Sequence, residues 1–124
     1  MKMLIVDDSK AMRTFLQHIA SEFSFQTEEA EDGRDGLHKL VNNDPRDPFA
    51  VALVDWEMPN MNGLELVRTV RRNREFNELK LLMVTTLNGM DNVTAALEAG
   101  ADDFLMKPVT KELLGEKLQI LGMV

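Results

Sequence analysis

The segment MLIVDDS, from Met3 to Ser9, decides the fold of this 124-residue chain. Its four apolar residues show no polar alternation, which is typical of a strand buried on both faces, as in a parallel sheet. The run stops on two aspartates, and Ser9 is a good N-cap for a helix that begins directly after it. The segment therefore predicts a buried strand with a polar end, followed at once by a helix.

Three later apolar runs also end on polar residues, and they read VALVD (51–55), LLMVTT (81–86) and FLMKP (104–108). A weaker, polar strand is expected at Gln26–Ala30, where it suits a sheet edge. Helical periods separate these runs, at about 10–23, 33–42, from 62 or 63 onwards, 91–99 with Gly100 as the C′ residue, and after the cap Thr110. Five β-α units, (βα)₅, predict an α/β fold with a parallel sheet and helices on both faces.

The spacing of apolar residues predicts which side of each helix faces the sheet. In the first helix the residues at helical spacing are Met12, Phe15, Leu16, Ile19 and Phe23, and in the second we expect Leu37, Leu40 and Val41 to face inward. Leu113 belongs to the apolar stripe expected of the last helix.

Composition limits the kinds of function that this chain can carry. With 44% hydrophobic and 28% charged residues, residues 1–124 are expected to form a single globular domain. The balance of 14 basic against 21 acidic residues, net −7, argues against nucleic-acid binding. The absence of cysteine excludes disulfides, thiol catalysis and Cys-ligated zinc. With no signal peptide and no apolar run of about 18 residues, we expect no membrane segment and a cytoplasmic location.

The polar residues at the strand ends predict a site for a divalent cation and a phosphoryl group. In a parallel sheet the carboxyl ends of the strands share one edge, where ligands bind. Asp7, Asp8 and Asp55 would repel one another there, and Mg²⁺ accepts such oxygen ligands while it shares phosphate oxygens. Lys107 and Thr85 could hold the other phosphoryl oxygens, and Asp55 could be the nucleophile.

Four motifs carry a resemblance to a known family: LIVDDS (4–9), DWEMPNMNGLEL (55–66), MVTT (83–86) and AGADDFLMKP (99–108). Together they resemble the CheY-like receiver domains of two-component response regulators, and the dodecamer is similar to the chemotaxis members. The resemblance covers essentially the whole chain, 1–124, as a single receiver domain. It implies a flavodoxin-like, doubly wound sheet of order 2-1-3-4-5, which makes the ends of strands 1 and 3 neighbours.

The resemblance also implies a role for each acidic residue of the site. Asp55 would be the phosphorylated residue. Asp7, Asp8 and Asp55 would hold Mg²⁺, with Asp8 as a direct ligand and Asp7 acting partly through water. Glu57 would add its backbone carbonyl as a further metal ligand.

Catalytic and switching roles follow from the same resemblance. Thr85 and Lys107 would act with Asp55 in phosphoryl transfer, and the Lys107–Pro108 peptide is expected to be cis. Phe104 would be an aromatic switch that moves together with Thr85. A sensor histidine kinase would supply the phosphoryl group. A downstream protein would read the face formed by the fourth helix, fifth strand and last helix, including Met90.

Other functions remain open at this point. The receiver would be a monomeric phosphoacceptor that assists its own phosphorylation and dephosphorylation, rather than an enzyme acting on an external substrate. A Mg²⁺-dependent phosphohydrolase with an aspartyl-phosphate intermediate is the main alternative. A flavodoxin-like cofactor binder is disfavoured because the first β-α turn, DDSKAM (7–12), is acidic and lacks a phosphate cradle. A phosphorylation-independent scaffold is a fourth possibility.

Overall fold

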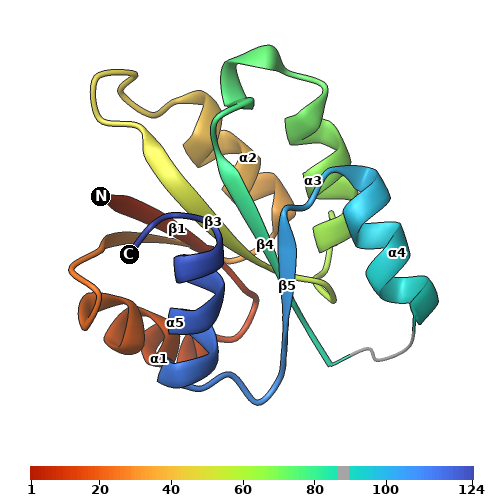
Figure 1. Ribbon diagram of the computed structural model, residues 1–124. Helices are drawn as coiled ribbons and strands as arrows, with labels where there is room; N and C mark the ends of the chain where they lie inside the picture. The colour runs from red at the N-terminus through yellow and green to blue at the C-terminus, as the bar shows by residue number, and fades with distance from the viewer. Residues whose placement is uncertain (87–89) are drawn as a thin grey trace.

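The computed structural model describes residues 1–86 and 90–124, with side chains for all of these except 90–92. Strands and helices alternate along this part of the chain (Figure 1). The strands are β1 (Lys2–Val6), β2 (Gln26–Ala30), β3 (Phe49–Asp55), β4 (Lys80–Thr85) and β5 (Asp103–Met106). The helices are α1 (Lys10–Ser21), α2 (Gly33–Val41), α3 (Gly63–Arg71), the 3₁₀ helix η1 (Arg74–Phe76), α4 (Met90–Ala99) and α5 (Lys111–Ile120).

The five strands form one parallel sheet in the order β2-β1-β3-β4-β5. This confirms the predicted (βα)₅ fold and its strand order. The polar strand β2 lies at an edge, as expected from its sequence. Val6 pairs with Val54, and Asp55 pairs with Val84, so β1, β3 and β4 end at the same level. The carboxyl ends of the central strands are therefore brought side by side.

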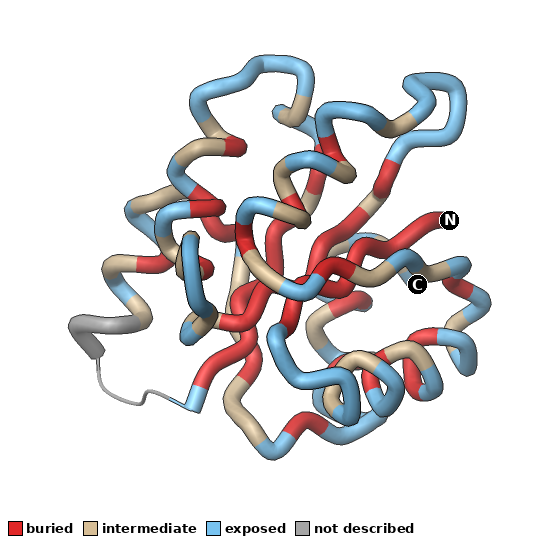
Figure 2. The backbone as a smooth tube through the Cα atoms, turned by 180° about the vertical axis from the view of Figure 1, so that it is seen from behind, coloured by how far each residue is buried: buried red, intermediate tan, exposed pale blue. Residues whose placement is uncertain are grey.

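Helices cover both faces of the sheet, and each layer has its own hydrophobic core. Helices α1 and α5 lie on one face, and α2, α3 and α4 lie on the other (Figure 1). The strands run through the buried centre (Figure 2), with Met3, Leu4 and Ile5 completely inaccessible. Burying each such side chain stabilises the fold by roughly 1.5–3 kcal/mol. Among the described helices, none has the length and apolar character needed to cross a membrane.

The predicted helix ends are found where the sequence places them. The Ser9 hydroxyl accepts a hydrogen bond from the Met12 amide at 3.2 Å, and the Thr110 hydroxyl accepts one from the Leu113 amide at 3.1 Å. Gly100 follows α4 with a φ of +118°, a left-handed conformation that glycine adopts without strain. Local sequence signals thus determine where α1 and α5 begin and where α4 ends.

Three apolar residues that were predicted to face the sheet are exposed instead. Val41, Phe15 and Leu113 are 59%, 43% and 38% accessible, so these predictions were wrong. Phe15 and Leu113 each precede a fully packed leucine, Leu16 and Leu114. The sheet contacts only one stripe along each helix, and periodicity does not decide which of two adjacent apolar residues lies in that stripe. Val41 is the last residue of its helix, at the end of the packed stripe.

Arg71, the last residue of α3, joins three segments on its side of the sheet. Its Nη1 donates to the Phe76 carbonyl at 2.8 Å and its Nη2 to the Leu79 carbonyl at 2.7 Å. Its Nε donates to the Gly100 carbonyl at 2.8 Å, and Nη2 pairs with the Asp102 carboxylate at 2.8 Å. One guanidinium therefore fixes η1, the start of β4 and the turn before β5.

We predict that Arg71→Ala lowers the free energy of unfolding by about 2 kcal/mol, because it leaves three carbonyls without this donor. Arg72→Ala is the matched control, since the neighbouring arginine is exposed and should change stability by less than about 0.5 kcal/mol. Urea denaturation of both variants tests this. Equal losses in the two variants would contradict the role given to Arg71.

Candidate functional site

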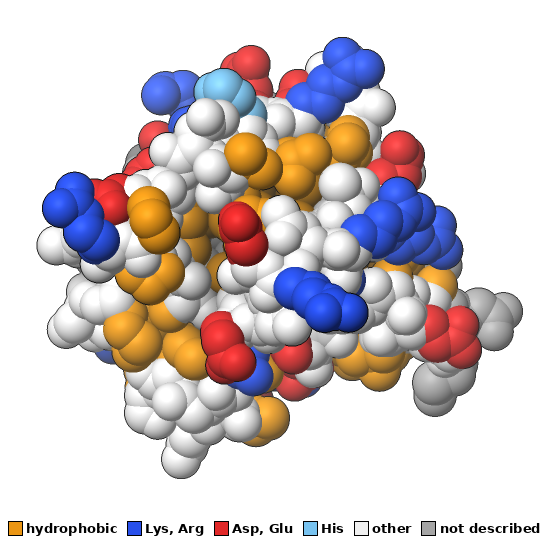
Figure 3. Space-filling view, turned by 90° about the horizontal axis from the view of Figure 1, so that it is seen from above, with side chains coloured by type: hydrophobic (Ala, Val, Ile, Leu, Met, Phe, Trp, Pro, Cys, Tyr) orange, Lys and Arg blue, Asp and Glu red, His pale blue; other side chains and the backbone are white. Residues whose placement is uncertain are grey.

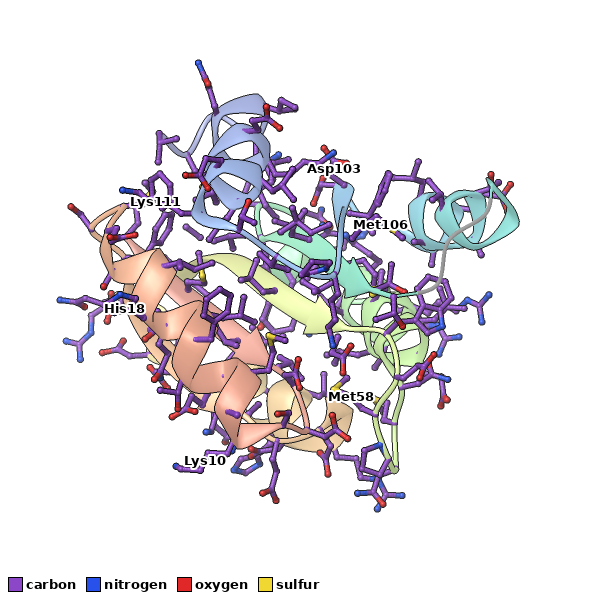
Figure 4. All side chains as sticks on the ribbon, turned by 90° about the horizontal axis from the view of Figure 1, so that it is seen from below. Lys10, His18, Met58, Asp103, Met106 and Lys111 are labelled. Atoms are coloured by element: carbon purple, nitrogen blue, oxygen red, sulfur yellow. The ribbon has the colours of Figure 1, made fainter. Side chains whose placement is uncertain are left out.

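Polar residues from four strands meet at the carboxyl edge of the sheet. Asp7 and Asp8 directly follow β1, Asp55 ends β3, Thr85 ends β4, and Lys107 directly follows β5. Figure 4 looks at this edge from below, with Met106 marking the end of β5 and Met58 the loop after β3. Because β1, β3, β4 and β5 are successive neighbours in the sheet, residues at their carboxyl ends lie close together although they are distant in the sequence.

Three carboxylates form an acidic cluster at this edge. Asp7, Asp8 and Asp55 each place one oxygen within 4.8 Å of the others. Asp7 and Asp55 are almost completely buried, at 1% and 5% accessibility, whereas Asp8 is exposed. Hard divalent cations bind carboxylate oxygens, and an exposed member leaves such a cluster open to solvent. The cluster fits a divalent metal site.

Lys107 is the cation that faces the acidic cluster in this part of the structure. Its Nζ lies 3.1 Å from Asp55 Oδ1 and 3.7 Å from Asp7 Oδ2. The backbone places it, because the Lys107 amide donates to the Thr85 carbonyl at 2.9 Å and the Lys107–Pro108 peptide is cis. One ammonium cannot balance three carboxylates, so the ionised site retains negative charge.

One buried oxygen of the cluster lacks a hydrogen bond. Asp7 Oδ1 accepts the Ser9 amide at 2.8 Å, but Asp7 Oδ2 has no hydrogen-bond donor among the described residues. The Lys107 ammonium at 3.7 Å is an ion-pair neighbour beyond hydrogen-bonding distance. Buried polar atoms are normally satisfied, and exceptions mark places where an ion or water binds. An ion or a water at the cluster would satisfy this oxygen, which is consistent with a cation site.

Burial and like charge perturb the acids of the cluster. Burial, with a further contribution from the negative charge of Asp7, raises the pKa of Asp55 to about 6, and Lys107 opposes the rise. Burial also raises the pKa of Asp7, against the Ser9 amide and Lys107. A bound divalent cation would favour the ionised forms and reverse both shifts.

A pocket of about 270 Å³ opens onto the cluster. It is lined by Asp8, Asp55, Trp56, Glu57, Thr86 and Lys107. The side chain of Glu57 is exposed at this pocket, and Trp56 is half-buried beside Asp55. The pocket gives an external phosphoryl donor a path to the Asp55 carboxylate.

Phe104 lies outside this pocket, on β5. Its half-buried ring packs against the hydrophobic core on the α2, α3 and α4 side of the sheet. The Lys117 ammonium lies 4.8 Å from the ring centroid and donates to Asp103 Oδ1 at 2.9 Å. Lys117 thus joins α5 to Phe104 by a cation–π contact and to Asp103 by an ion pair.

Two glycines that the sequence analysis did not assign to the site hold the loop after β3. A Cβ added at Gly63 would lie 2.2 Å from the carbonyl oxygen of Asp55, and the Gly63 amide donates to the Trp56 carbonyl at 2.9 Å. A Cβ at Gly33 would lie 2.4 Å from the Met61 carbonyl oxygen. The sequence predicts a helix that begins at Asn62 or Gly63. It does not show that the Asp55 backbone approaches Gly63, because that approach depends on tertiary packing.

Arg13 is a further contributor to the site that no sequence pattern indicated. Its Nη1 donates to the backbone carbonyl of Asp7 at 2.7 Å, and its Nε pairs with Glu29 at 3.0 Å. The guanidinium therefore fixes the peptide that carries the buried aspartate. A lone arginine one turn into a helix gives no signal of this role in the sequence.

The chain matches a known family over nearly its whole length. The family model of the response regulator receiver domain matches residues 3–119. The chain is 40% identical over 123 residues to chemotaxis protein CheY1 of Helicobacter pylori, covering 98% of this chain and 96% of that protein. It is 39% identical over 124 residues to a chemotaxis protein CheY homolog of Campylobacter jejuni, covering 98% and 93%.

Solved structures show the same architecture. Chemotaxis protein CheY4 of Vibrio cholerae superposes with a TM-score of 0.87 at 32% identity, covering 97% of both chains. A CheY-like response regulator receiver domain protein of Methanospirillum hungatei superposes with a TM-score of 0.84 at 34% identity, covering 98% of this chain and 93% of that one.

We predict that Asp55→Asn stabilises the metal-free protein, and that the gain grows with pH. The folded-state pKa of about 6 is above the unfolded value, so the stability that Asp55 contributes is fully present below pH ~4 and is lost as the pH rises through ~6. Asparagine does not titrate, so the variant should gain about 2 kcal/mol at pH 7 and little at pH 4.

Urea denaturation in EDTA across this pH range tests the prediction. Glu98→Gln, an exposed change on α4, is the control and should show no such pH trend. A gain for Asp55→Asn that is the same at pH 4 and pH 7 would rule out the raised pKa as its cause.

We also predict that Gly63→Ala destabilises the fold by about 2 kcal/mol or more, because its Cβ would overlap the Asp55 backbone. Gly36→Ala in α2 is the control: its nearest neighbour is a Val6 methyl at 3.1 Å, so its effect should stay within about 1 kcal/mol. Thermal denaturation measures both. Equal stability of Gly63→Ala and wild type would show that the close approach is not required.

Proposed function

The chain belongs to the response regulator receiver family of two-component signalling proteins, and we propose that Asp55 is its phosphorylated residue. Residues 1–124 would act as a single receiver domain. The CheY-like relatives make a role in chemotaxis the first pathway to test.

The observation that carries this proposal is the position of Asp55. Its carboxylate ends a central strand, lines an open pocket, and lies 3.1 Å from a lysine and next to two further carboxylates. A nucleophilic carboxylate needs to be ionised and reachable, and it needs neighbours that stabilise charge developing on a phosphoryl group. Lys107 favours the ionised form against the effect of burial.

Phosphorylation would proceed by transfer from a phosphohistidine of a sensor histidine kinase. An Asp55 carboxylate oxygen attacks phosphorus, the new P–O bond forms as the P–N bond breaks, and the imidazole nitrogen retains the electron pair. With acetyl phosphate, acetate is the leaving group instead. Water later attacks the aspartyl phosphate, which releases inorganic phosphate and restores the carboxylate.

Mg²⁺ is the cation that we assign to the acidic cluster. Asp7, Asp8 and Asp55 would hold it together with the backbone carbonyl of Glu57, and the unsatisfied Asp7 oxygen supports this choice. When bound, the ion supplies positive charge that neutralises the cluster and the incoming phosphoryl oxygens. Lys107 would move from Asp55 toward the phosphoryl group.

Thr85 and Phe104 would convert the phosphorylation of Asp55 into a structural change at the α4–β5–α5 face. The Thr85 hydroxyl would donate to a phosphoryl oxygen, and its movement would let the Phe104 ring move inward. Lys117 and Asp103 hold the ring region before phosphorylation.

A downstream protein would then bind the α4–β5–α5 face. Val93 and Phe104 are half-buried members of this face, and the side chain of Met90 lies outside the described residues. Neither the kinase nor this protein is identified. The monomeric state, the cytoplasmic location and the absence of an external substrate stay predictions.

We predict that acetyl phosphate with Mg²⁺ phosphorylates the wild-type protein and changes the fluorescence of Trp56, which lines the pocket beside Asp55. Asp55→Asn should lose both responses. Asp44→Asn, which removes an exposed aspartate in the loop before β3, at the other end of that strand from Asp55, should keep them. Intact-protein mass spectrometry and fluorescence titration are the measurements, each with and without EDTA.

An equal response in wild type and Asp55→Asn would overturn Asp55 as the acceptor. A response that persists in EDTA would overturn the metal site alone. Sustained phosphate release from a panel of phosphomonoesters would favour the phosphohydrolase alternative over the receiver.

A further inference from the structure

A second pocket lies at the opposite end of the strands from Asp55, where β3 and β4 begin. Its volume is about 440 Å³, within the range of roughly 300–1,000 Å³ that ligand pockets occupy. The end of α2, the loop 42–48 and the segment from η1 to β4 form its walls. Figure 3 views this end of the molecule, where hydrophobic side chains surround a hollow. Its apolar lining includes Leu40, Val41, Pro45, Phe49, Phe76 and Leu79.

A buried lysine holds one wall of this pocket in place. Lys2 is 7% accessible, and its Nζ donates to Asn43 Oδ1 at 2.5 Å. The same ammonium lies 4.3 Å from the centroid of the Phe49 ring and 3.4 Å from Asp47 Oδ2. The loop 42–48 is therefore tied to β1 by contacts that involve residues of the lining itself.

Arg71 holds the other wall. Its two donors to the carbonyls of Phe76 and Leu79, at 2.8 Å and 2.7 Å, fix the backbone of two residues that line the pocket. The pocket is thus shaped before any ligand arrives. A partner that enters it pays little for ordering the protein side of the interface.

The two charged residues that line the pocket are both acidic. Glu75 and Glu78 line it, and neither carboxylate has an ion-pair partner among the described residues. No lysine or arginine belongs to the described lining, and the whole chain carries a net charge of −7. An occupant that suits the pocket combines an apolar group with positive charge.

We propose that this pocket is a docking site for a partner protein, which inserts a large apolar side chain flanked by lysine or arginine. Phe49, Phe76 and Leu79 would contact the apolar side chain, and Glu75 and Glu78 would pair with the flanking cations. The two glutamates of the lining disfavour a polyanion such as nucleic acid. The pocket lies at the far edge of the sheet from Asp55, so the proposal does not depend on phosphorylation.

The test is a titration of ¹⁵N-labelled protein with two synthetic peptides, acetyl-Lys-Phe-Leu-Lys-amide and its charge-reversed match acetyl-Glu-Phe-Leu-Glu-amide. The basic peptide should shift the amide signals of Leu40, Phe49 and Phe76 in a saturable manner. The acidic peptide should not. Weak affinity is expected, because one apolar anchor and two exposed ion pairs supply little binding free energy.

Variants separate this pocket from general attraction to an acidic protein. Glu75→Gln with Glu78→Gln should weaken binding of the basic peptide by about fivefold, whereas Glu112→Gln with Glu116→Gln on α5 should leave it unchanged. Val41→Lys adds a cation at an exposed position of the lining and should also weaken it. The proposal would be overturned if both peptides bind alike, or if the two double glutamine variants lose the same affinity for the basic peptide. It would also be overturned if the basic peptide shifts amide signals outside the pocket instead, or shifts none. If the amide signals of the pocket residues shift with protein concentration in the absence of peptide, the pocket binds a second copy of the chain, and this result would also overturn the proposal.

Discussion

The constraint on which the rest of the structure depends is the repulsion among three carboxylates at one edge of the sheet. At about 4 Å and an effective dielectric constant near 20, each like-charge pair costs on the order of 4 kcal/mol when both acids are ionised. Asp7 and Asp55 are nearly inaccessible to water, and Lys107 is the one ammonium that the described residues place against them. The surrounding fold must hold these groups together against their own charge.

Several contacts supply that restraint, and each acts on backbone beside the cluster. Arg13 binds the carbonyl of Asp7, the Lys107 amide binds the carbonyl of Thr85, and Gly63 lets α3 approach the carbonyl of Asp55 closely. Behind them lie fully buried strands that cannot shift without losing apolar contacts. A site held under repulsion in this way gains stability when a cation or a rearranged ion pair relieves the charge. Functional sites often sacrifice stability for this reason.

The two ends of the strands differ in how their charged groups are balanced. At the carboxyl edge, buried acids outnumber the cation that faces them. At the amino edge, Lys2 and Arg71 are satisfied by carbonyl, amide and carboxylate oxygens and serve as braces for the loops. The result is one edge poised to change its charge and another whose pocket has a fixed shape. One small domain can thereby present two independent surfaces at opposite ends of its strands.

The sequence by itself determined the alternation of strands and helices, the caps at Ser9 and Thr110, and the polar residues at the strand ends. These features are local, because hydrophobic runs, capping side chains and glycine conformation depend on near neighbours in the chain. The strand order came from family resemblance and agreed with the structure. Tertiary packing alone sets the exposure of Val41, the close approach of Gly63 to the Asp55 backbone, and the lack of a donor to one Asp7 oxygen among the described residues. Those properties depend on which backbone and side chains approach from distant parts of the chain, and no local pattern encodes that approach.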